Sequence, residues 1–520
     1  MTFMPIQRIL QLAVLICLGC GALSCTRSLD SQPDQDPVAV VNPVTQLIQS
    51  NTRQALAVVI ASGNGDKPLT DAMTKGRLTI AQAVALFYQQ RGFTTAWNNP
   101  AAIDALLNAL AELKQDGLEP QDYRLSQLKK QHEQQRTRSA ESTAQFDLQL
   151  THAYLLALAH LRNGKLDPDR LTPAREFTAK TFSEPPGLRE ANDAIDQLQI
   201  AQLFERARPK LPAYQLWRKA LVQLQAEQAE SWPQLTTDKT LKTGMIDDQV
   251  VVLRKRLQTA GLLAESQTYS KFFDEALAAT VKKYQQEQVL DADGAVGPAT
   301  RAALNIPVTT HIEQVRANLE RARWLFNDMP PAFVMVDAAA YTVYFYKNNE
   351  IVWSSRVQVG KPYRSTPIFR SRITHITFNP TWTIPPTILR EDVLPKLQKD
   401  LSYLTQNNIR VLNNKKEELD PTRIDWNNPG NIMLRQDAGE KNALGRAAIR
   451  FPNKYAVYLH DTPHQSNFGK SRRTFSSGCI RVEHPLELVE LLMNDSESWN
   501  RAAIDAEIAK RETHNVNLPQ

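Results

Sequence analysis

The chain contains few cysteines and no dense run of basic residues. Four Cys in 520 residues exclude a disulfide scaffold. A net charge of +6, from 61 Lys and Arg against 55 Asp and Glu, is too small to indicate nucleic-acid binding. With 42% hydrophobic and 22% charged residues, the chain is also too apolar and too evenly charged for a disordered protein. Its length predicts about three domains rather than one core.

Cys17, Cys20 and Cys25 lie in an N-terminal segment that has no charge from Ile9 to Thr26. Its apolar centre has the length of a signal-peptide core and is short for a membrane span, although an uncleaved anchor is an alternative. The residues up to Cys25 (Ala-Leu-Ser-Cys) resemble a bacterial lipoprotein cleavage box, in which the Cys becomes lipidated. Cleavage at a nearby small residue is the rival interpretation. We expect residues 1–25 to be a signal peptide and the protein to be periplasmic, with membrane attachment through a lipidated Cys25 as one form.

The next two regions differ in composition and periodicity. Residues 26–44 are rich in Ser, Asp, Gln and Pro and predict a flexible linker. Residues 45–240 carry helical stripes of apolar side chains, and we expect a helical scaffold domain there. His152 and His160 fall in one such helix without an acidic residue at ligand spacing, so we interpret both as structural.

Residues 244–305 form a compact unit of three predicted helices. The string from Asp291 to Thr300 (Asp-Ala-Asp-Gly-Ala-Val-Gly-Pro-Ala-Thr) predicts a tight turn that enters the third helix. This turn, after a helix that ends near Gln285 and Gln286, resembles the signature of the three-helix peptidoglycan-binding domain. A calcium loop is disfavoured, because Ala302 occupies the position where a Glu ligand would be needed.

From about residue 330 to 510 the hydrophobic pattern alternates, which predicts a mostly-β domain. Residues 386–430 interrupt it, and we expect a helical insertion that acts as a mobile cap over the substrate. The predicted fold class is therefore multidomain α+β: a helical scaffold, a three-helix module and a β domain with a helical insertion.

Cys479 would be the one unmodified thiol of the exported chain, and its neighbours favour reactivity over inert packing. It follows Ser476, Ser477 and Gly478, and Gly allows close approach of a substrate carbonyl. A thiol needs a base, and an imidazole can supply it. Among the nine His residues we favour His460, which closes an apolar strand, over His464 and His375.

His460, a spacer of about 15 residues, and Ser476-Ser477-Gly478-Cys479 resemble the signature of the L,D-transpeptidase catalytic domain. Ser477 stands where that family has a second histidine, and Arg481 stands where it has an asparagine. These departures resemble the large Gram-negative branch, whose members combine a scaffold, a peptidoglycan-binding module and an inserted cap. Relatives in this branch continue with further strands after the point where this sequence ends.

The resemblance implies a cysteine-dependent acyltransferase that cross-links peptidoglycan and is inhibited by carbapenems. Cys479 would form a thioester with a donor tetrapeptide stem, and an acceptor stem would resolve it. His460 would be oriented by the backbone carbonyl of Asp461, or, from the residues alone, by its side chain. Backbone N–H groups of Gly478 and Cys479 would hold the oxyanion.

Further expectations concern substrate contacts and alternatives. Arg481 could recognise a carboxylate or form a structural salt bridge, Ser477 flanks the nucleophile, and Trp382 and Tyr458 could line the cleft or be core.

We expect no cofactor and no metal, because the mature chain lacks clustered His and Cys. The sequence names no protein partner and predicts no nucleic-acid partner. The alternative functions are an L,D-carboxypeptidase that uses water as acceptor, and a non-catalytic wall-binding protein.

Overall fold

The computed structural model describes residues 42–61, 79–134, 139–167, 171, 187–228, 233–264, 269–327 and 329–518. The predicted signal peptide, with Cys17, Cys20 and Cys25, lies outside these ranges, as does most of the predicted linker. None of the helices in the described ranges is long and apolar enough to cross a membrane.

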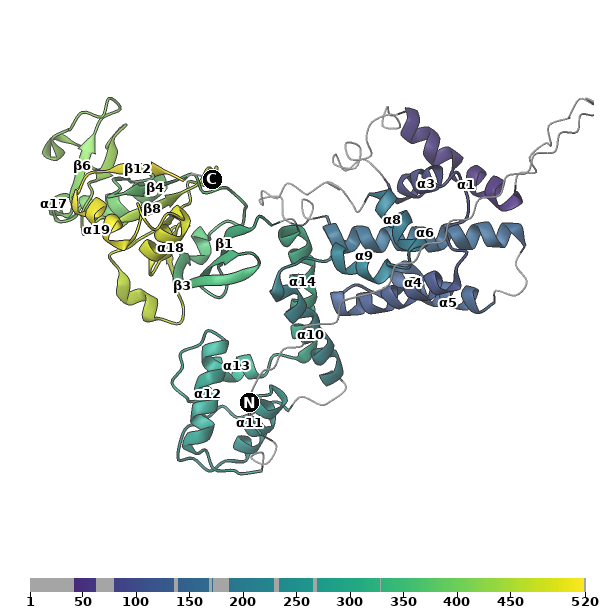
Figure 1. Cartoon of the computed structure of the whole chain (residues 1–520). Coiled ribbons are helices and arrows are strands. Elements are labelled where there is room, and N and C mark those ends of the chain that lie inside the picture. The colour runs from purple at the N-terminus through teal and green to yellow at the C-terminus, as the bar shows by residue number, and fades with distance from the viewer. Residues whose placement is uncertain are drawn as a thin grey trace, which may run out of the picture. The chain divides into compact units, whose positions relative to one another are not determined.

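The predicted scaffold region consists of helices joined by turns and loops in its described parts (Figure 1). Its elements are α1 (Pro43–Ala61), α3 (Ile80–Gln90), α4 (Pro100–Glu112), η1 (Leu113–Asp116), η2 (Pro120–Tyr123), α5 (Leu125–Glu133), α6 (Ala140–Asn163), α8 (Leu188–Asp196), α9 (Ile200–Ala207) and α10 (Pro212–Glu227). Local chemistry sets some of these ends. The Asn99 side chain accepts a hydrogen bond from the Ala101 N–H at the start of α4, and Gly117 ends η1 with φ +71°.

A helix beyond the three-helix module also belongs to this helical core. In α14 (Val308–Phe326), Val308, Ile312 and Leu319 are buried against Tyr214 and Leu221 of α10. The Arg323 guanidinium donates to the Asp116 carbonyl at 2.8 Å. This helix, which follows the three-helix module in the chain, therefore packs with the scaffold helix α10.

The three-helix module contains α11 (Asp248–Thr259), α12 (Glu275–Glu287) and α13 (Pro298–Leu304). Gln285 is 1% exposed and organises the turn before α13. Its amide nitrogen donates to Asp293, to the Ala295 carbonyl and to Thr300 at 2.9–3.0 Å, and its oxygen accepts from the Gly294 N–H at 2.8 Å. The motif that carries the sequence resemblance therefore stabilises the turn itself.

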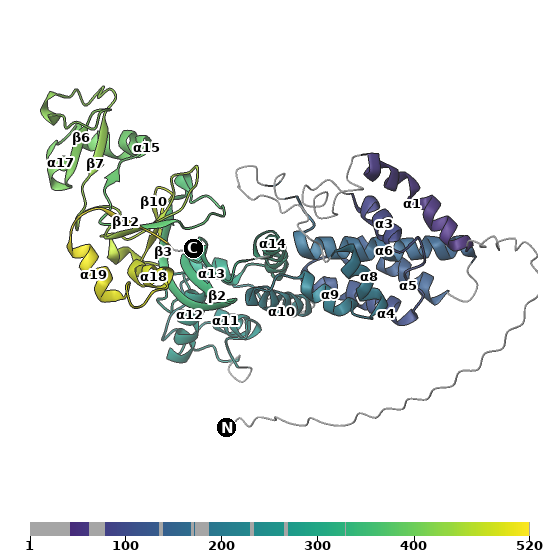
Figure 2. The same cartoon turned by 45° about the horizontal axis from the view of Figure 1, so that its top comes forward.

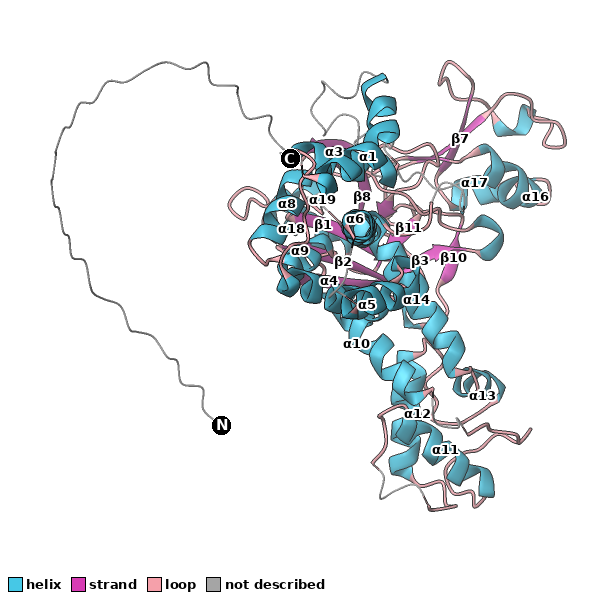
Figure 3. Ribbon diagram, turned by 90° about the vertical axis from the view of Figure 1, so that its right-hand side faces the viewer, coloured by secondary structure: helices cyan, strands magenta, loops and turns pink. Residues whose placement is uncertain are grey.

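The C-terminal domain is built on a nine-stranded sheet, counted over the described residues, in the order β1-β2-β3-β11-β9-β8-β4-β12, with β10 beside β3. Figure 3 shows the strands of the chain in magenta. The strands are β1 (Ala332–Asp337), β2 (Thr342–Lys347), β3 (Glu350–Gly360), β4 (His375–Phe378), β8 (Ala447–Arg450), β9 (Leu459–His460), β10 (Thr474–Ser476), β11 (Ile480–Val482) and β12 (His514–Asn517). The helices α18 (Pro485–Met493) and α19 (Arg501–Ala509) share its hydrophobic core.

Residues between β4 and β8 form a subdomain with its own core, here called the cap (Figure 2). It contains β5 (Trp382–Thr383), α15 (Pro386–Ile388), the π-helical turn η6 (Leu389–Val393), α16 (Leu394–Leu397), α17 (Ser402–Gln406), β6 (Ile409–Leu412), η7 (Pro421–Arg423) and β7 (Met433–Gln436). Its strands make a three-stranded antiparallel sheet, β5-β7-β6. The prediction of a helical insertion over 386–430 was thus incomplete, because the short strands β5 and β7 at its two ends pair with each other and extend it.

Candidate active site

Two rows of polar side chains cross the centre of the sheet. Strand register places Arg481 opposite His460 on one side and opposite Gln358 on the other. Two residues along each strand, Arg450, Tyr458 and Cys479 form a neighbouring row, and the Ile480 N–H donates to the Tyr458 carbonyl. Because side chains alternate between the two faces of a sheet, both rows lie on one face.

The residues between these positions are apolar and face the other way. They are all buried in the core that includes α18 and α19: Val357, Val359, Ile449, Leu459, Ile480 and Val482. Because side chains alternate in these short strands, one face of the sheet packs against the hydrophobic core, and the opposite face carries Cys479 and His460.

Ser476 organises the loop that presents Cys479. Its hydroxyl donates to the Cys479 carbonyl at 2.5 Å and accepts from the Gly478 N–H at 3.1 Å. Gly478 has φ +119°, a conformation that L side chains rarely adopt, so a glycine is required there. The predicted oxyanion role of the Gly478 N–H conflicts with this arrangement, because that N–H already has an acceptor. In the described part of the chain nothing accepts from the Cys479 N–H, which leaves it as the free donor of the pair.

The backbone of Asp461 orients the His460 ring. The imidazole is 3% exposed, and its Nδ1 lies 2.5 Å from the Asp461 carbonyl oxygen. A carbonyl only accepts, so Nδ1 carries the proton and Nε2 has a free lone pair. This tautomer can take a proton from a thiol.

The Asp461 carboxylate is used elsewhere. Its Oδ2 accepts from the Arg446 backbone N–H at 3.0 Å and from the Arg446 Nε at 2.7 Å. A Cβ at Gly445 would lie 2.5 Å from the Asp461 Cβ, so the turn closes tightly around this side chain. The alternative in which the side chain orients His460 is therefore wrong for this conformation.

Burial keeps the resting thiol and imidazole uncharged. Desolvation raises the pKa of Cys479, although the Tyr458 backbone N–H, Arg450 and Arg481 oppose the shift. Desolvation, together with the charge of Arg481, lowers the pKa of His460 to about 3. At neutral pH the pair is therefore thiol and neutral imidazole, and the thiolate forms only as the proton is transferred.

Two arginines surround the thiol without an acidic partner in the described ranges. Arg481 donates from Nη1 to Gln358 at 3.3 Å, and its buried Nε has no described acceptor. The Arg450 guanidinium lies 4.0 Å from the Tyr458 ring centroid. The alternative of a structural salt bridge at Arg481 thus has no carboxylate to complete it in this part of the chain. The face carries positive charge that suits an anionic ligand.

The other predicted contact residues lie close to this face. The ring centroids of Tyr458 and His460 are 5.7 Å apart, and Arg450 and Trp382 lie near enough to the Tyr458 hydroxyl to lower its pKa. Burial nevertheless raises the Tyr458 pKa to about 12. Trp382 comes from β5 and so brings the cap to the site. The Ser477 hydroxyl accepts from Arg364 at 2.9 Å.

The two other histidines considered as bases are placed differently. His375 lies on β4, which is separated from β11 by β8 and β9. Three strand spacings of about 4.8 Å put it roughly 14 Å from the Cys479 strand, too far for direct proton transfer. His464 has an exposed side chain on the loop after β9, and its backbone carbonyl accepts from Gln358 at 3.2 Å.

Sequence reasoning missed Arg450, Ser476 as the loop's organiser, and Arg364. Arg450 could have been found by extending the strand alternation across β8, because Ala448 and Arg450 share a face. Ser476 was noted only as a flanking residue. No local signal identifies Arg364, whose partners are 27, 28 and 113 residues away.

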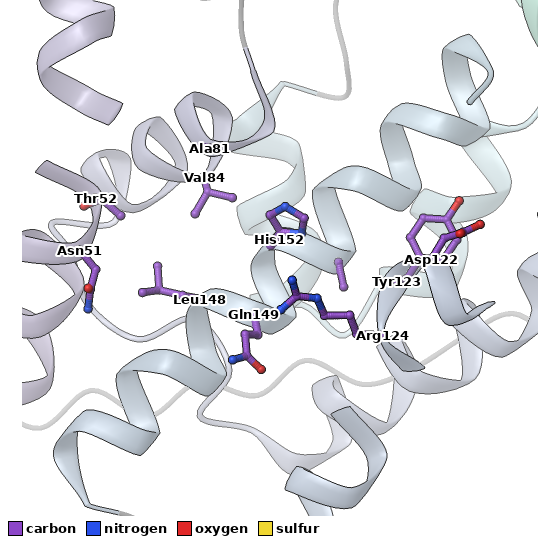
Figure 4. Close-up of a pocket in the computed structure, with 11 residues that line it drawn as sticks. Asn51, Thr52, Ala81, Val84, Asp122, Tyr123, Arg124, Leu148, Gln149 and His152 are labelled. Atoms are coloured by element: carbon purple, nitrogen blue, oxygen red, sulfur yellow. The ribbon is translucent and has the colours of Figure 1, made fainter. Parts of the chain in front are cut away.

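A hollow of about 270 Å³ lies in the helical scaffold and contains none of the predicted site residues (Figure 4). Val84 and Leu148 contribute apolar walls, and Arg124, Gln149 and His152 contribute polar groups. Burial and the charge of Arg124 lower the pKa of His152, so this imidazole is neutral at pH 7. It has no acidic partner among the described residues.

The comparisons with known proteins follow the same division of the chain. Residues 82–221 match the family model described as "Scaffold domain", and residues 247–304 match "Putative peptidoglycan binding domain". Residues 331–498 match "L,D-transpeptidase catalytic domain". A curated protein of Haemophilus influenzae named "Putative L,D-transpeptidase" is 34% identical over 183 residues, which cover 35% of this chain and 37% of that protein. Three consecutive regions of the chain therefore match the scaffold, peptidoglycan-binding and L,D-transpeptidase catalytic family models, in that order, and these matches confirm the resemblance drawn from its sequence.

Proposed function

We propose that the protein is a periplasmic L,D-transpeptidase that cross-links peptidoglycan through a thioester on Cys479. The observation that carries the proposal is the tautomer of His460, whose Nδ1 faces the Asp461 carbonyl while Cys479 lies in the adjacent row of the same sheet face. The matches to a catalytic and a peptidoglycan-binding family support the same substrate. Attachment to the membrane through a lipidated Cys25 is part of the proposal and rests on the sequence alone.

In the first half-reaction, the Cys479 sulfur attacks the carbonyl between meso-diaminopimelate and the terminal D-alanine of a donor tetrapeptide. His460 Nε2 takes the thiol proton and gives it to the departing D-alanine amine. The C–N bond breaks and a thioester remains. The Cys479 N–H would stabilise the oxyanion, while Ser476 holds the loop that carries it.

In the second half-reaction, the side-chain amine of an acceptor diaminopimelate attacks the thioester. His460 takes a proton from that amine and returns it to the departing sulfur, which restores the thiol. Arg481 and Arg450 would bind stem carboxylates during both steps, and Trp382 and Tyr458 would form the wall beside them.

The cap is proposed to cover the bound stem. Deleting it at its strand ends should impair turnover on polymeric peptidoglycan while the nine-stranded sheet stays folded. Unchanged turnover on that substrate would contradict this role.

Product analysis tests the reaction. Purified protein incubated with disaccharide tetrapeptides should yield diaminopimelate-to-diaminopimelate cross-linked dimers and free D-alanine, detected by liquid chromatography and mass spectrometry. Tripeptide stems without dimers would identify an L,D-carboxypeptidase. Binding to isolated sacculi that is identical in wild type and Cys479→Ala, with no product from either, would identify a wall-binding protein without activity.

A further inference from the structure

A short turn after β3 is bonded directly to the Cys479 loop. In this turn, residues 361–366, the Lys361 N–H donates to the Ser476 carbonyl at 3.0 Å and the Thr366 hydroxyl donates to the Gly478 carbonyl at 2.8 Å. A Cβ at Gly360 would lie 2.2 Å from the Arg364 carbonyl oxygen, so the turn folds tightly back on its strand. The backbone of Arg364 is therefore fixed relative to the nucleophile.

The Arg364 side chain connects this turn to the cap. Its Nη1 donates to the Ser477 hydroxyl at 2.9 Å and to the Asp392 carboxylate, and its Nη2 donates to Glu391 at 2.5 Å. The Arg364 side chain is 12% exposed, against 44% for Glu391 and 40% for Asp392. One guanidinium thus bonds the loop beside the nucleophile and two cap residues at once, and the forked geometry of arginine is what permits it.

The backbone of the two acidic residues is part of the cap. They lie in the π-helical turn η6, whose last residue, Val393, is buried in the cap core with Leu397. A π-turn is wider than an α-turn and is frequent at functional sites. Displacement of the backbone that carries Glu391 and Asp392 therefore accompanies movement of the cap.

We propose that Arg364 is a positioning residue that couples closure of the cap to the conformation of the Cys479 loop. When the cap is seated, Arg364 holds Ser477, and through it the residue next to Gly478, in the geometry that receives the donor stem. When the cap lifts, the guanidinium loses its two carboxylates and the loop loses this restraint. The proposal rests on the proposed function for its substrate, but the structural coupling can be measured without turnover.

The test compares variants that break the contact from each side. Arg364→Gln removes both connections, the double variant Glu391→Gln with Asp392→Asn removes only the cap side, and Ser477→Ala removes only the loop side. Arg364→Lys keeps the charge but lacks the fork. Arg423→Gln is the control, because Arg423 is a cap arginine that is 86% exposed and pairs with Asp420, away from the nucleophile loop.

The first readout is hydrogen exchange of amides in residues 389–397 and 476–479. Arg364→Gln should speed exchange in both segments at least tenfold. The double cap variant should also speed exchange in both, since the coupling passes through Arg364, whereas Arg423→Gln should match wild type. Faster exchange only in the cap of the double variant, with the 476–479 segment unchanged, would overturn the coupling.

The second readout separates this role from general structure. For a tetrapeptide donor, kcat/KM of Arg364→Gln should fall at least tenfold, and adding the two cap substitutions should cause little further loss. Arg364→Lys should recover only part of the activity. Reaction of Cys479 with iodoacetamide, which needs no cap, should change less than threefold. If the wild-type protein makes no product, the proposed function fails, and the hydrogen-exchange data alone decide whether the cap and the Cys479 loop are coupled. If the wild-type protein is active and Arg364→Gln has the same exchange rates and the same kcat/KM, the inference is wrong.

Discussion

The Nδ1 atom of His460 lies 2.5 Å from the carbonyl oxygen of Asp461, while the Asp461 carboxylate bonds Arg446 instead. A backbone oxygen therefore does the orienting that a carboxylate does in a Ser-His-Asp triad. A carbonyl fixes the tautomer but adds no full negative charge to stabilise an imidazolium. This agrees with a histidine whose pKa is low and which is neutral before reaction.

Replacing the base should abolish acylation while preserving the fold. His460→Gln keeps a polar side chain of similar size but cannot accept the thiol proton, and acylation should slow by about 10²- to 10⁴-fold. The measurement is the pre-steady-state rate of adduct formation with a carbapenem. His464→Gln is the matched control and should stay within about threefold of wild type. If acylation instead slowed in His464→Gln and not in His460→Gln, His464 would be the base.

The free thiol should titrate at high pH. Burial raises the Cys479 pKa and lowers that of His460, so no thiolate–imidazolium pair is populated at neutral pH. The rate of alkylation by iodoacetamide should therefore keep rising with pH past 8. A plateau between pH 5 and 8, as a resting ion pair would give, is the result that contradicts this.

Acid should destabilise the catalytic domain through His460. Its folded pKa of about 3 lies below the unfolded value of about 6.5, so between these values the unfolded state binds more protons. This contribution is complete above pH 6.5 and is lost as pH falls. From pH 7 to 5 the loss from this group is about 2 kcal/mol in the free energy of unfolding. His460→Gln, compared with wild type by urea unfolding at both pH values, should lack this part of the dependence; identical slopes would show that His460 is not buried as a neutral group.

The two roles considered for Asp461 predict different outcomes for Asp461→Asn. The backbone carbonyl survives, so acylation should stay within a few-fold of wild type. Loss of the buried carboxylate that pairs with Arg446 should cost about 1–3 kcal/mol of stability. Asp437→Asn, which breaks the partly exposed pair with Arg410, serves as control and should cost less than about 1 kcal/mol. A hundredfold loss of acylation in folded Asp461→Asn would restore the side-chain role.

Arg481 should act on charged substrates more than on the thiol. Arg481→Gln should lower kcat/KM for a tetrapeptide donor about 10- to 100-fold, mainly through KM, because a charge-assisted bond to a carboxylate is lost. Alkylation by uncharged iodoacetamide should change only a few-fold. Equal losses with both reagents would mean that Arg481 works through Cys479 rather than through the substrate.

Sequence patterns predict the local elements better than they predict the long-range contacts. The helical stripes, the turn before Pro298 and the strand that ends at His460 are short-range features, and each appears in the fold. The cap sheet was missed because β5 has two residues and pairs with β7 some 50 positions later. Arg364 was missed for the same reason, since its function depends on three partners brought together only by folding.

Sequence patterns also fail to predict which hydrogen bonds form within the candidate site. The Gly before Cys479 was expected to free its N–H for an oxyanion, but the Ser476 hydroxyl takes that hydrogen bond. Side-chain rotamers of this kind cannot be read from residue spacing. The catalytic roles of Cys479 and His460 remain predictions that the geometry supports.

Intact-protein mass spectrometry after incubation with a carbapenem tests the central claim most directly. If Cys479 is an acylating nucleophile served by His460, wild type should gain the mass of one carbapenem, and peptide mapping should place it on Cys479. Cys479→Ala should gain none, although it should still bind sacculi as wild type would. A well-folded wild type that forms no adduct, or an adduct that persists in Cys479→Ala, would contradict the account.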